Sequence, residues 1–489
     1  MDNKKEQLIE IVGTAYVADD PATLNEYAKD NSFTPAKRPS FVVKPKTVQE
    51  VQLLVGWANA AKTPLTPVSS GAPHFRGDTV PEKDDSVIVD MSRMNKIIRI
   101  DSRNRIVIIE PGVTYAQLQP ELAKAGLKVS MPLMPRYNKS VIASLLEREP
   151  LTGSRYQWSL MEPLRCLEVV WGDGSMMWTG EAGEYVKDLD KQEEIQRSAV
   201  VGMGPNSVDY YRFISAAQGS MAIVTWASIK CEILPSVHKV FYVTSEKLES
   251  LLDFAYEIEK IRYGDEMFIV NRSQLAYMLG EDGDGVRKIR ENLPTWTLLL
   301  GIAGRRYLPE ERVDYQSRDI SQIAKNHNLE LAPEIQGVRS EKVLECLEDT
   351  CSGIYWKLRY KGNIQDIFFM TTLDKTPGFV DTMLSAADEM LFDKNEVGVY
   401  IQPQQQGCVC HCEFSLPYND GDAEKIEKVF LASSRKLMDK GAYFSRPYGI
   451  WADLMYKRDE NNTMLLKRIK NLFDPNGIMN PGKLCFKGE

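Results

Sequence analysis

Two hydrophobic periodicities alternate along the N-terminal part of the chain. Apolar residues recur at three- and four-residue steps over residues 48–61, which predicts an amphipathic helix. Short apolar runs, such as residues 86–90, predict strands. Across residues 41–126 the patterns predict the order β-α-β-β-β-α, and the first 35 residues predict a helical segment packed against this unit. Further on, Gly172-Asp-Gly174 predicts a hairpin.

A second pattern begins at Pro235–Lys239, where strands and helices alternate again. The expected strands are 240–244, 296–302, 397–402 and 408–416, and the expected helices are 245–261, 309–327, 377–391 and 423–440. A chain of 489 residues is long enough for two domains. We therefore predict an α+β fold with three parts: residues 1–236, residues 237–440, and a segment 441–489 that returns to the first part.

Composition narrows the possible functions. The chain is 43% hydrophobic and 26% charged, as globular proteins are, and its net charge of −8 argues against a nucleic-acid partner. No run of about 18 apolar residues suggests a membrane span. The charged N-terminus is unlike a secretory signal, so the eight cysteines are expected to be reduced thiols. These features predict a cytoplasmic protein.

Three turn-rich segments interrupt the periodic patterns. Residues 66–81 contain the small residues Ser69, Ser70, Gly71 and Ala72, whose exposed amides suit a pyrophosphate. Residues 108–115 place Pro-Gly at the end of a predicted strand. Residues 472–484 turn the chain twice, at Asp-Pro-Asn-Gly and at Asn-Pro-Gly-Lys. Each segment brings bare backbone close to another part of the molecule.

These segments, together with residues 140–148, 167–174 and 218–225, resemble the FAD-binding oxidoreductases of the vanillyl-alcohol oxidase / p-cresol methylhydroxylase superfamily. The resemblance covers about residues 38–235 and resumes from about residue 441. It implies an FAD-binding domain of the p-cresol methylhydroxylase type, built of two subdomains. It also implies a cap domain whose antiparallel sheet, covered by helices, lies over the flavin. The implied reaction is hydride transfer from a substrate carbon to flavin N5.

The resemblance also implies the cofactor contacts. The loop of residues 67–77 would hold the diphosphate, two further segments would contact the adenosine and pyrophosphate, and the C-terminal turn would lie near the flavin ring or ribityl chain. The implied residues are Pro67, Val68, Ser69, Ser70, Gly71, Ala72, Pro73, His74, Gly77, Pro111, Gly112, Val113, Thr114, Ser140, Val141, Ala143, Ser144, Arg148, Ile223, Val224, Asn480 and Lys483.

One set of candidate catalytic residues lies on the predicted strand 408–416. Strand alternation places His411 and Glu413 on one face, where they form either a general base with its carboxylate or a structural pair. The cysteines at 408, 410 and 412 fall on the other face and span ~13 Å, too far for one tetrahedral metal ion. We therefore expect buried thiols and no metal.

Tyr443, Arg446 and Tyr448 form the second set. They offer the groups with which phenol-oxidising members of the superfamily stabilise a phenolate, although the spacing differs. Arg446 would bind any carboxylate or phenolate, or alternatively pair with Asp453 or with the FAD-binding domain.

The sequence departs from the superfamily at three places. His74 is shifted by one residue from the usual attachment histidine, so noncovalent FAD is expected. The loop tyrosine that helps to bind phenols is replaced near Arg76, and residues 154–158 lack the usual acidic residue. Positive charge at Arg76, Arg155 and Arg446 instead suits a carboxylated substrate.

Three functions therefore stay open. The first is an FAD-dependent oxidoreductase acting on a small alcohol or para-substituted phenol, with His411 or a tyrosine as base. Its variant is a 2-hydroxy-acid dehydrogenase, which residues 11–19 favour by their likeness to glycolate and D-lactate dehydrogenases. The second is a flavin-carrying electron-transfer subunit whose reoxidation depends on an iron–sulfur or cytochrome partner. The protein partner expected for the chain is either such a subunit or a second copy of the chain in a homodimer. The third is a flavin-binding relative without catalysis.

Overall fold

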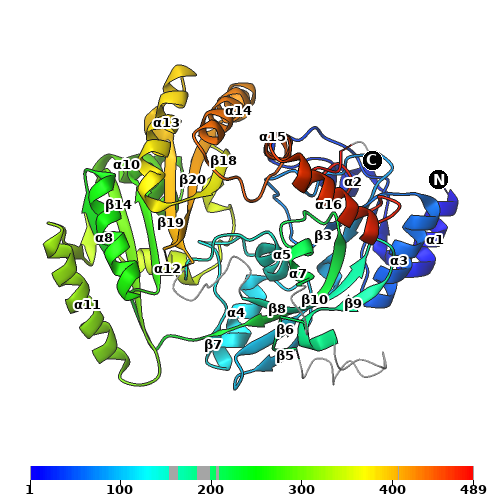
Figure 1. Cartoon of the computed structure of the whole chain (residues 1–489), viewed down its shortest axis with the longest axis horizontal. Coiled ribbons are helices and arrows are strands. Elements are labelled where there is room, and N and C mark those ends of the chain that lie inside the picture. Colours follow the sequence, from blue (N-terminus) through cyan, green and yellow to red (C-terminus); the bar gives the residue numbers. More distant parts are fainter. Residues whose placement is uncertain (1, 154–162, 184–198, 205–208, 406, 488–489) are drawn as a thin grey trace.

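The computed structural model describes residues 2–153, 163–183, 199–204, 209–405 and 407–487. Residues 154–158, and with them Arg155, lie outside the described residues. The α+β class is confirmed: three larger sheets, two of them wholly antiparallel, carry helices on their faces (Figure 1). Among the described residues, no helix is both long enough and apolar enough to cross a bilayer.

The first sheet has the order β1-β2-β4-β3. Its strands are β1 (Val17–Ala18), β2 (Phe41–Val43), β3 (Leu65–Val68) and β4 (Val87–Asp90), and β2 and β3 run parallel to β4. Helix α3 (Val48–Ala61) connects β2 to β3, and Thr47 Oγ1 caps it by accepting from the amide of Glu50. Helix α1 (Asp2–Val12) precedes β1, and α2 (Pro21–Ala28) lies between β1 and β2, within the N-terminal segment that was predicted to be helical.

The second sheet is antiparallel, with the order β5-β6-β10-β8-β9. It comprises β5 (Ile97–Asp101), β6 (Ile106–Ile109), β8 (Leu164–Trp171), β9 (Met176–Trp178) and β10 (Ala222–Lys230). Helices α4 (Tyr115–Lys124), α5 (Val141–Leu146) and α7 (Tyr211–Ile214) share its hydrophobic core. The predicted hairpin at residues 172–174 is present between β8 and β9. A short pair, β7 (Leu127–Lys128) with β11 (Glu232–Ile233), leads to the next domain.

The third sheet has seven antiparallel strands in the order β15-β12-β14-β13-β19-β20-β18. They are β12 (Val237–Ser245), β13 (Glu266–Asn271), β14 (Trp296–Gly304), β15 (Leu331–Ala332), β18 (Asn363–Thr371), β19 (Gly398–Gln404) and β20 (Val409–Tyr418). Helices α8 (Leu248–Ile261), α11 (Pro309–Asn326), α13 (Thr376–Glu389) and α14 (Ala423–Asp439) share a core with one face. Helices α9 (Arg272–Leu279), α10 (Gly283–Asn292) and α12 (Glu341–Glu348) contribute to the core on the other.

The sequence patterns did not predict β13, β18, α9, α10 or α12. The pattern of β18 is obscured because Asp366 and Phe368 share a face of the strand, so polar and apolar residues do not alternate. The short hairpin of β16 (Glu334–Ile335) and β17 (Val338–Arg339) was also missed.

After the third sheet, which we call the cap sheet, the chain returns to the first sheet. Helices α15 (Ile450–Tyr456) and α16 (Glu460–Phe473) precede the C-terminal turn, and Leu65 of β3 forms a parallel bridge with Met479. The backbone amide of Leu65 donates to Ile478 O at 2.8 Å, and that of Asn480 donates to Leu65 O at 2.8 Å. The final turn thus lies beside β3, the strand that directly precedes the predicted diphosphate loop in sequence.

An ion cluster at the start of the cap sheet makes stability depend on pH. His238 Nε2 lies 2.9 Å from Glu266 Oε2, its Nδ1 lies 2.8 Å from Glu348, and Lys128 lies 3.8 Å from Glu266. Burial opposes the imidazolium, but Glu266 and Glu348 outweigh it and raise the pKa of His238 to about 9. The stabilising contribution is complete below pH 6.5 and disappears as pH rises through about 9.

We therefore expect the melting temperature to fall between pH 6.5 and 9.5 more steeply in the wild type than in His238→Gln. Removal of the imidazole abolishes this titration, which contributes up to about 3 kcal/mol to the free energy of unfolding. Thermal unfolding at several pH values checks the prediction. Parallel curves for the two proteins would contradict it.

Candidate active site

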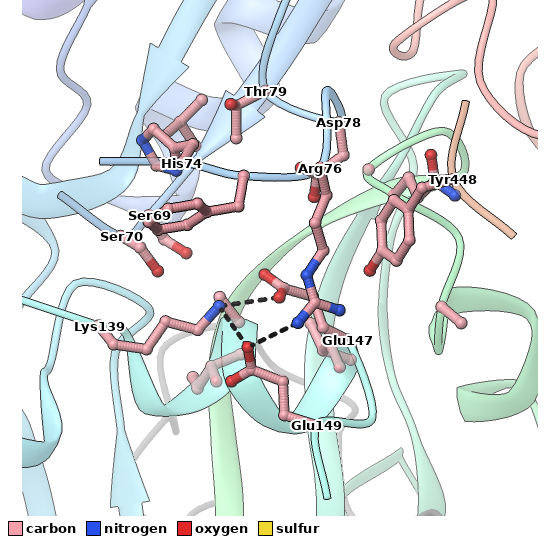
Figure 2. Close-up of a pocket in the computed structure, with 18 of the residues that line it drawn as sticks. Ser69, Ser70, His74, Arg76, Asp78, Thr79, Lys139, Glu147, Glu149 and Tyr448 are labelled. Atoms are coloured by element: carbon pink, nitrogen blue, oxygen red, sulfur yellow. Dashed lines mark hydrogen bonds and ion pairs between the residues drawn. The ribbon is translucent and has the colours of Figure 1, made fainter. Parts of the chain in front are cut away.

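A pocket lies where the first two sheets meet the cap sheet, between the loop after β3 and strand β18 (Figures 1 and 2). It contains about 1650 Å³ of empty space, including the part that opens to solvent. The polar and aromatic side chains on its wall are Ser69, Ser70, His74, Phe75, Arg76, Asp78, Thr79, Arg136, Lys139, Glu147, Glu149, Gln218, Tyr355, Lys357, Gln365, Asp366, Phe368 and Tyr448.

The segment before α5 fixes the predicted diphosphate loop. Arg136 Nη1 donates to Gly71 O at 2.8 Å, Asn138 Nδ2 donates to Ala72 O at 2.7 Å, and the Gly71 amide donates to Asn138 O at 3.0 Å. A Cβ at position 71 would lie 2.4 Å from Asn138 Nδ2, so only glycine permits this close packing. These contacts fix the shape of the loop.

The opposite wall is a strained backbone segment. Ala216, Gln218 and Gly219 have φ angles of 57°, 54° and 68°, and all three line the pocket. Left-handed conformations are costly for residues other than glycine, and such residues cluster at functional sites. A Cβ on Gly219 would lie 2.6 Å from Pro67 Cγ, so this segment also packs tightly against the loop.

A cluster of charges forms the floor of the pocket (Figure 2). Lys139 Nζ lies 2.8 Å from Glu147 Oε2 and 3.4 Å from Glu149 Oε1, and Arg76 Nη2 lies 3.4 Å from the same Glu149 oxygen. Ser144 Oγ donates to Glu149 at 2.6 Å. Burial disfavours the carboxylate of Glu149, but Lys139 and Arg76 outweigh it and lower its pKa to about 2.

Aromatic rings and guanidinium groups alternate on the cap side. The Phe368 ring centroid lies 4.7 Å from the guanidinium carbon of Arg76 and 4.3 Å from that of Arg446, and the Tyr448 ring lies 5.3 Å from Arg76. The Nη1 atom of Arg76 is buried and has no hydrogen-bond partner among the described residues. A buried donor of this kind is rare in folded proteins and indicates a missing acceptor.

Lys357 connects the pocket wall to the residues behind it. Its ammonium lies 2.7 Å from Asp366 Oδ2 and 2.5 Å from Glu413 Oε1, and Ser415 Oγ donates to Asp366 Oδ1 at 2.7 Å. Burial raises the pKa of Asp366, more than Lys357 lowers it. Asp366 and Lys357 line the pocket, whereas Glu413 is behind them.

The five predicted catalytic residues separate into different environments. His411 and Glu413 share a face of β20, 3.3 Å apart, but neither lines the pocket, and burial lowers the pKa of His411 to about 4. Tyr443 is 59% exposed. Arg446 is buried behind Phe368, where its Nη1 donates to Glu147 O at 3.5 Å, and Tyr448 lines the pocket.

The predicted cofactor residues form a wall and a supporting layer. Those that line the pocket are Pro67, Val68, Ser69, Ser70, His74, Pro111, Ala143, Ile223 and Val224. The others lie behind them: Ser140 Oγ, for example, donates to Pro111 O at 2.6 Å. Asn480 Nδ2 donates to Asp78 O at 2.8 Å, and Lys483 Nζ donates to Gly77 O at 2.8 Å. These two residues thus hold the backbone of the loop after β3 in place without lining the pocket themselves.

Apart from Arg76, the cations and carboxylates of the pocket were missed by the sequence patterns. Lys139, Glu147 and Glu149 flank α5 within an otherwise apolar stretch, and this concentration of charge was an available signal. Arg136 was hidden in the preceding turn. Lys357, Asp366 and Phe368 gave no signal because their strand and turn were not predicted.

The pocket suits FAD by its chemistry. Small residues at 143, 216, 217, 219 and 222 leave backbone accessible, and the preformed loop presents serine hydroxyls beside Arg136 and Lys139. A dinucleotide with a diphosphate requires such a combination of bare backbone and positive charge. Among the described residues, no group of three or more histidine, cysteine, aspartate or glutamate side chains could hold a metal ion.

Comparison with known families matches two regions of the chain. Residues 39–180 match the FAD binding domain, and residues 451–484 match the C-terminal domain of FAD linked oxidases. The chain is 24% identical to D-2-hydroxyglutarate dehydrogenase of Stutzerimonas stutzeri (strain A1501), over 98% of both chains. It is also 24% identical to the glycolate oxidase subunit GlcD of Bacillus subtilis (strain 168), over 99% of this chain and 97% of that one.

Solved structures show the same fold. p-Cresol methylhydroxylase with bound substrate superposes with a TM-score of 0.83 at 16% identity, over 99% of this chain and 97% of that one. The 4-ethylphenol oxidase from Gulosibacter chungangensis also gives 0.83, at 18% identity, over 100% and 97%. The chain thus carries an FAD binding domain and a C-terminal domain of FAD linked oxidases on the fold of p-cresol methylhydroxylase; it is an FAD-linked oxidoreductase, and its cofactor is FAD.

Proposed function

We propose that the protein oxidises a small para-substituted phenol or phenolic alcohol whose ionised oxygen binds to Arg76. The observation that carries this proposal is the Nη1 atom of Arg76, a residue of the pocket wall. This atom is buried and has no hydrogen-bond partner among the described residues. An unsatisfied buried donor costs about 1–3 kcal/mol. A phenolate oxygen at this atom would remove that cost, and its negative charge would suit the guanidinium.

The aromatic surroundings of Arg76 favour a substrate with a ring. Phe368 and Tyr448 flank the guanidinium, and Phe75 packs on Tyr355 with ring centroids 5.5 Å apart. All four rings line the pocket. Apolar walls with a few convergent polar groups are typical of sites for small aromatic ligands.

Bound FAD would supply the hydride acceptor. The chain's own residues would then orient the substrate, exclude water and accept a proton. We assign the proton-accepting role to Asp366 in place of His411, because Asp366 lines the pocket and His411 does not. Its Oδ2 atom would take the proton of the phenolic hydroxyl group and so leave the ionised oxygen that binds to Arg76. Lys357, 2.7 Å away, would fix the carboxylate.

A second candidate substrate is a 2-hydroxy acid, whose carboxylate would occupy the same position at Arg76. The two relatives that align over nearly their full lengths support it, because their names refer to D-2-hydroxyglutarate and glycolate. The electrons would pass either to oxygen or to a partner protein. We keep the phenol first because of the four aromatic rings on the pocket wall.

Anaerobic reduction of the purified holoprotein tests the proposal. We expect 4-hydroxybenzyl alcohol and 4-ethylphenol to bleach the flavin absorbance, and benzyl alcohol, which lacks the ionisable oxygen, to leave it unchanged. Bleaching by glycolate or D-lactate alone would instead establish the second candidate. A flavin that no member of this panel reduces would refute both.

Replacement of Asp366 tests the assignment of the base. We expect Asp366→Asn to slow flavin reduction by at least about 100-fold, because general bases contribute roughly 100- to 10,000-fold. Glu413→Gln is the matched control: it removes the other carboxylate on Lys357, behind the pocket wall, and should slow reduction by less than about 10-fold. Stopped-flow absorbance measures both rates. Wild-type reduction by Asp366→Asn would exclude this role.

A further inference from the structure

Lys139 is a buried cation on the pocket wall. It is 6% exposed, and its ammonium is shared between Glu147 at 2.8 Å and Glu149 at 3.4 Å. It directly precedes Ser140, the residue that caps α5. Burial of a lysine is unusual unless the ammonium is paired. The Lys139 ammonium is therefore paired with two carboxylates at once.

The diphosphate loop lies directly beside Lys139. The amide of Ser140 donates to Ser70 Oγ at 3.1 Å, which joins the backbone next to Lys139 to the loop. Figure 2 shows the ammonium between Ser69 and Ser70 on one side and the carboxylates of Glu147 and Glu149 on the other. Hydroxyl groups, bare amides and a lysine ammonium around one space are the usual surroundings of a phosphate.

Three cations and two carboxylates of the pocket wall surround this space. Arg76 and Lys139 pair with Glu147 and Glu149, and Arg136 donates to Gly71 O at 2.8 Å. A diphosphate would add two negative charges close to the glutamates. A lysine ammonium has three donors on a flexible stem, so it can exchange one carboxylate for a phosphate oxygen and keep the other.

We propose that Lys139 binds the diphosphate of FAD and releases Glu147 when the cofactor enters. Glu149 keeps its contacts with Arg76 and Ser144 and stays in place. Lys139 therefore favours FAD binding, and Glu147 competes with the cofactor for the same ammonium. This exchange concerns cofactor binding alone and does not depend on the substrate proposed above.

The experiment measures flavin affinity. FAD release from diluted holoprotein is followed by the recovery of flavin fluorescence, and binding of FAD and riboflavin is then titrated on the released protein. We expect Lys139→Gln to weaken FAD binding by roughly 10- to 100-fold, as loss of a charge-assisted hydrogen bond predicts. Riboflavin, which has no phosphate, should bind this variant and the wild type equally. Glu147→Gln should tighten FAD binding and reduce its dependence on salt.

Lys139→Arg keeps the charge and should lose less than about 10-fold in affinity. The matched control is Lys124→Gln on α4, an exposed lysine paired with Glu121 at 2.7 Å, which should change nothing. Wild-type FAD affinity in Lys139→Gln, equal losses for FAD and riboflavin, or weaker FAD binding in Glu147→Gln would each overturn the proposal. So would a flavin that stays attached to the denatured wild-type chain. If Lys139→Gln does not fold, Glu147→Gln and Lys139→Arg still decide the matter.

Discussion

Arg76→Met is expected to slow anaerobic flavin reduction by a phenolic substrate by about 100- to 1,000-fold, while FAD stays bound. The methionine keeps the aliphatic packing against Phe368 but removes the guanidinium and its buried Nη1 donor. Loss of a charge-assisted contact to an oxygen anion costs about 3–4 kcal/mol when the anion is left buried. That cost converts to the stated factor in rate. Stopped-flow reduction at several substrate concentrations separates affinity from rate.

Two variants control this prediction. The Phe368 ring also contacts the guanidinium of Arg446, which does not line the pocket. Arg446→Met removes this second guanidinium and should slow reduction by less than about 10-fold. Arg76→Lys keeps the charge without the planar donors and should recover only part of the rate. If Arg76→Met reduces its flavin at the wild-type rate, the substrate anion lies elsewhere and the phenolate assignment fails.

Local sequence was a good guide to strands that obey simple alternation. On β20, His411 and Glu413 share one face, and Cys410 and Cys412 lie in the core on the other, as predicted. The prediction of a buried thiol was wrong for Cys408, which precedes the strand and is exposed. Alternation could not show that Lys357 stands between Glu413 and the pocket, because Lys357 is 56 residues away in sequence. The sequence thus correctly predicted that His411 and Glu413 are neighbours, but it did not predict that both lie outside the pocket.

The same limit explains the missed half of the pocket. Asp366 and Phe368 point to the same side of β18, and the buried charge is tolerated only because Lys357 and Ser415 satisfy it. A strand pattern broken by a compensated charge cannot be recognised from neighbouring residues alone. Buried charges that interrupt an apolar pattern are expected at functional sites. The strand that was not predicted, β18, is accordingly the one that forms the cap side of the pocket.

The C-terminal turn was predicted from its Pro and Gly residues, but its anchoring was not. Asn480 and Lys483 hold loop carbonyls at Asp78, Gly77 and Val80. Which distant carbonyl groups a buried amide or ammonium will satisfy depends on the tertiary fold. The turn therefore supports the cofactor loop from the side opposite the pocket.

A buried ion pair fixes this turn, and its loss should have the largest effect on stability. Lys470 and Asp474 are 2% and 1% exposed and contact each other. Lys470 Nζ also donates to Ser220 O at 2.5 Å and Met479 O at 2.9 Å. Asp474 accepts from the amides of Ile478 and Met479 at 3.0 and 2.9 Å. Five polar contacts therefore converge on one buried pair.

Asp474→Ala is expected to lower the free energy of unfolding by about 3–5 kcal/mol, because it leaves a buried ammonium and two amides without their acceptor. Urea unfolding measures this loss. The exposed pair of Glu424 and Lys428 on α14 is the control, and Glu424→Ala should cost less than about 1 kcal/mol. The double variant Lys470→Met, Asp474→Leu should regain part of the loss, since it removes both charges together.

The same substitution should release the cofactor before the chain unfolds. Met479 and Asn480 hold β3 through Leu65, and Asn480 and Lys483 hold the loop of residues 77–80, so a loosened turn removes the support of the diphosphate loop. Flavin fluorescence in Asp474→Ala should therefore rise at a lower urea concentration than the loss of helical signal. Coincident transitions, or a loss of stability no larger than that of Glu424→Ala, would show that the ion pair does not anchor the site.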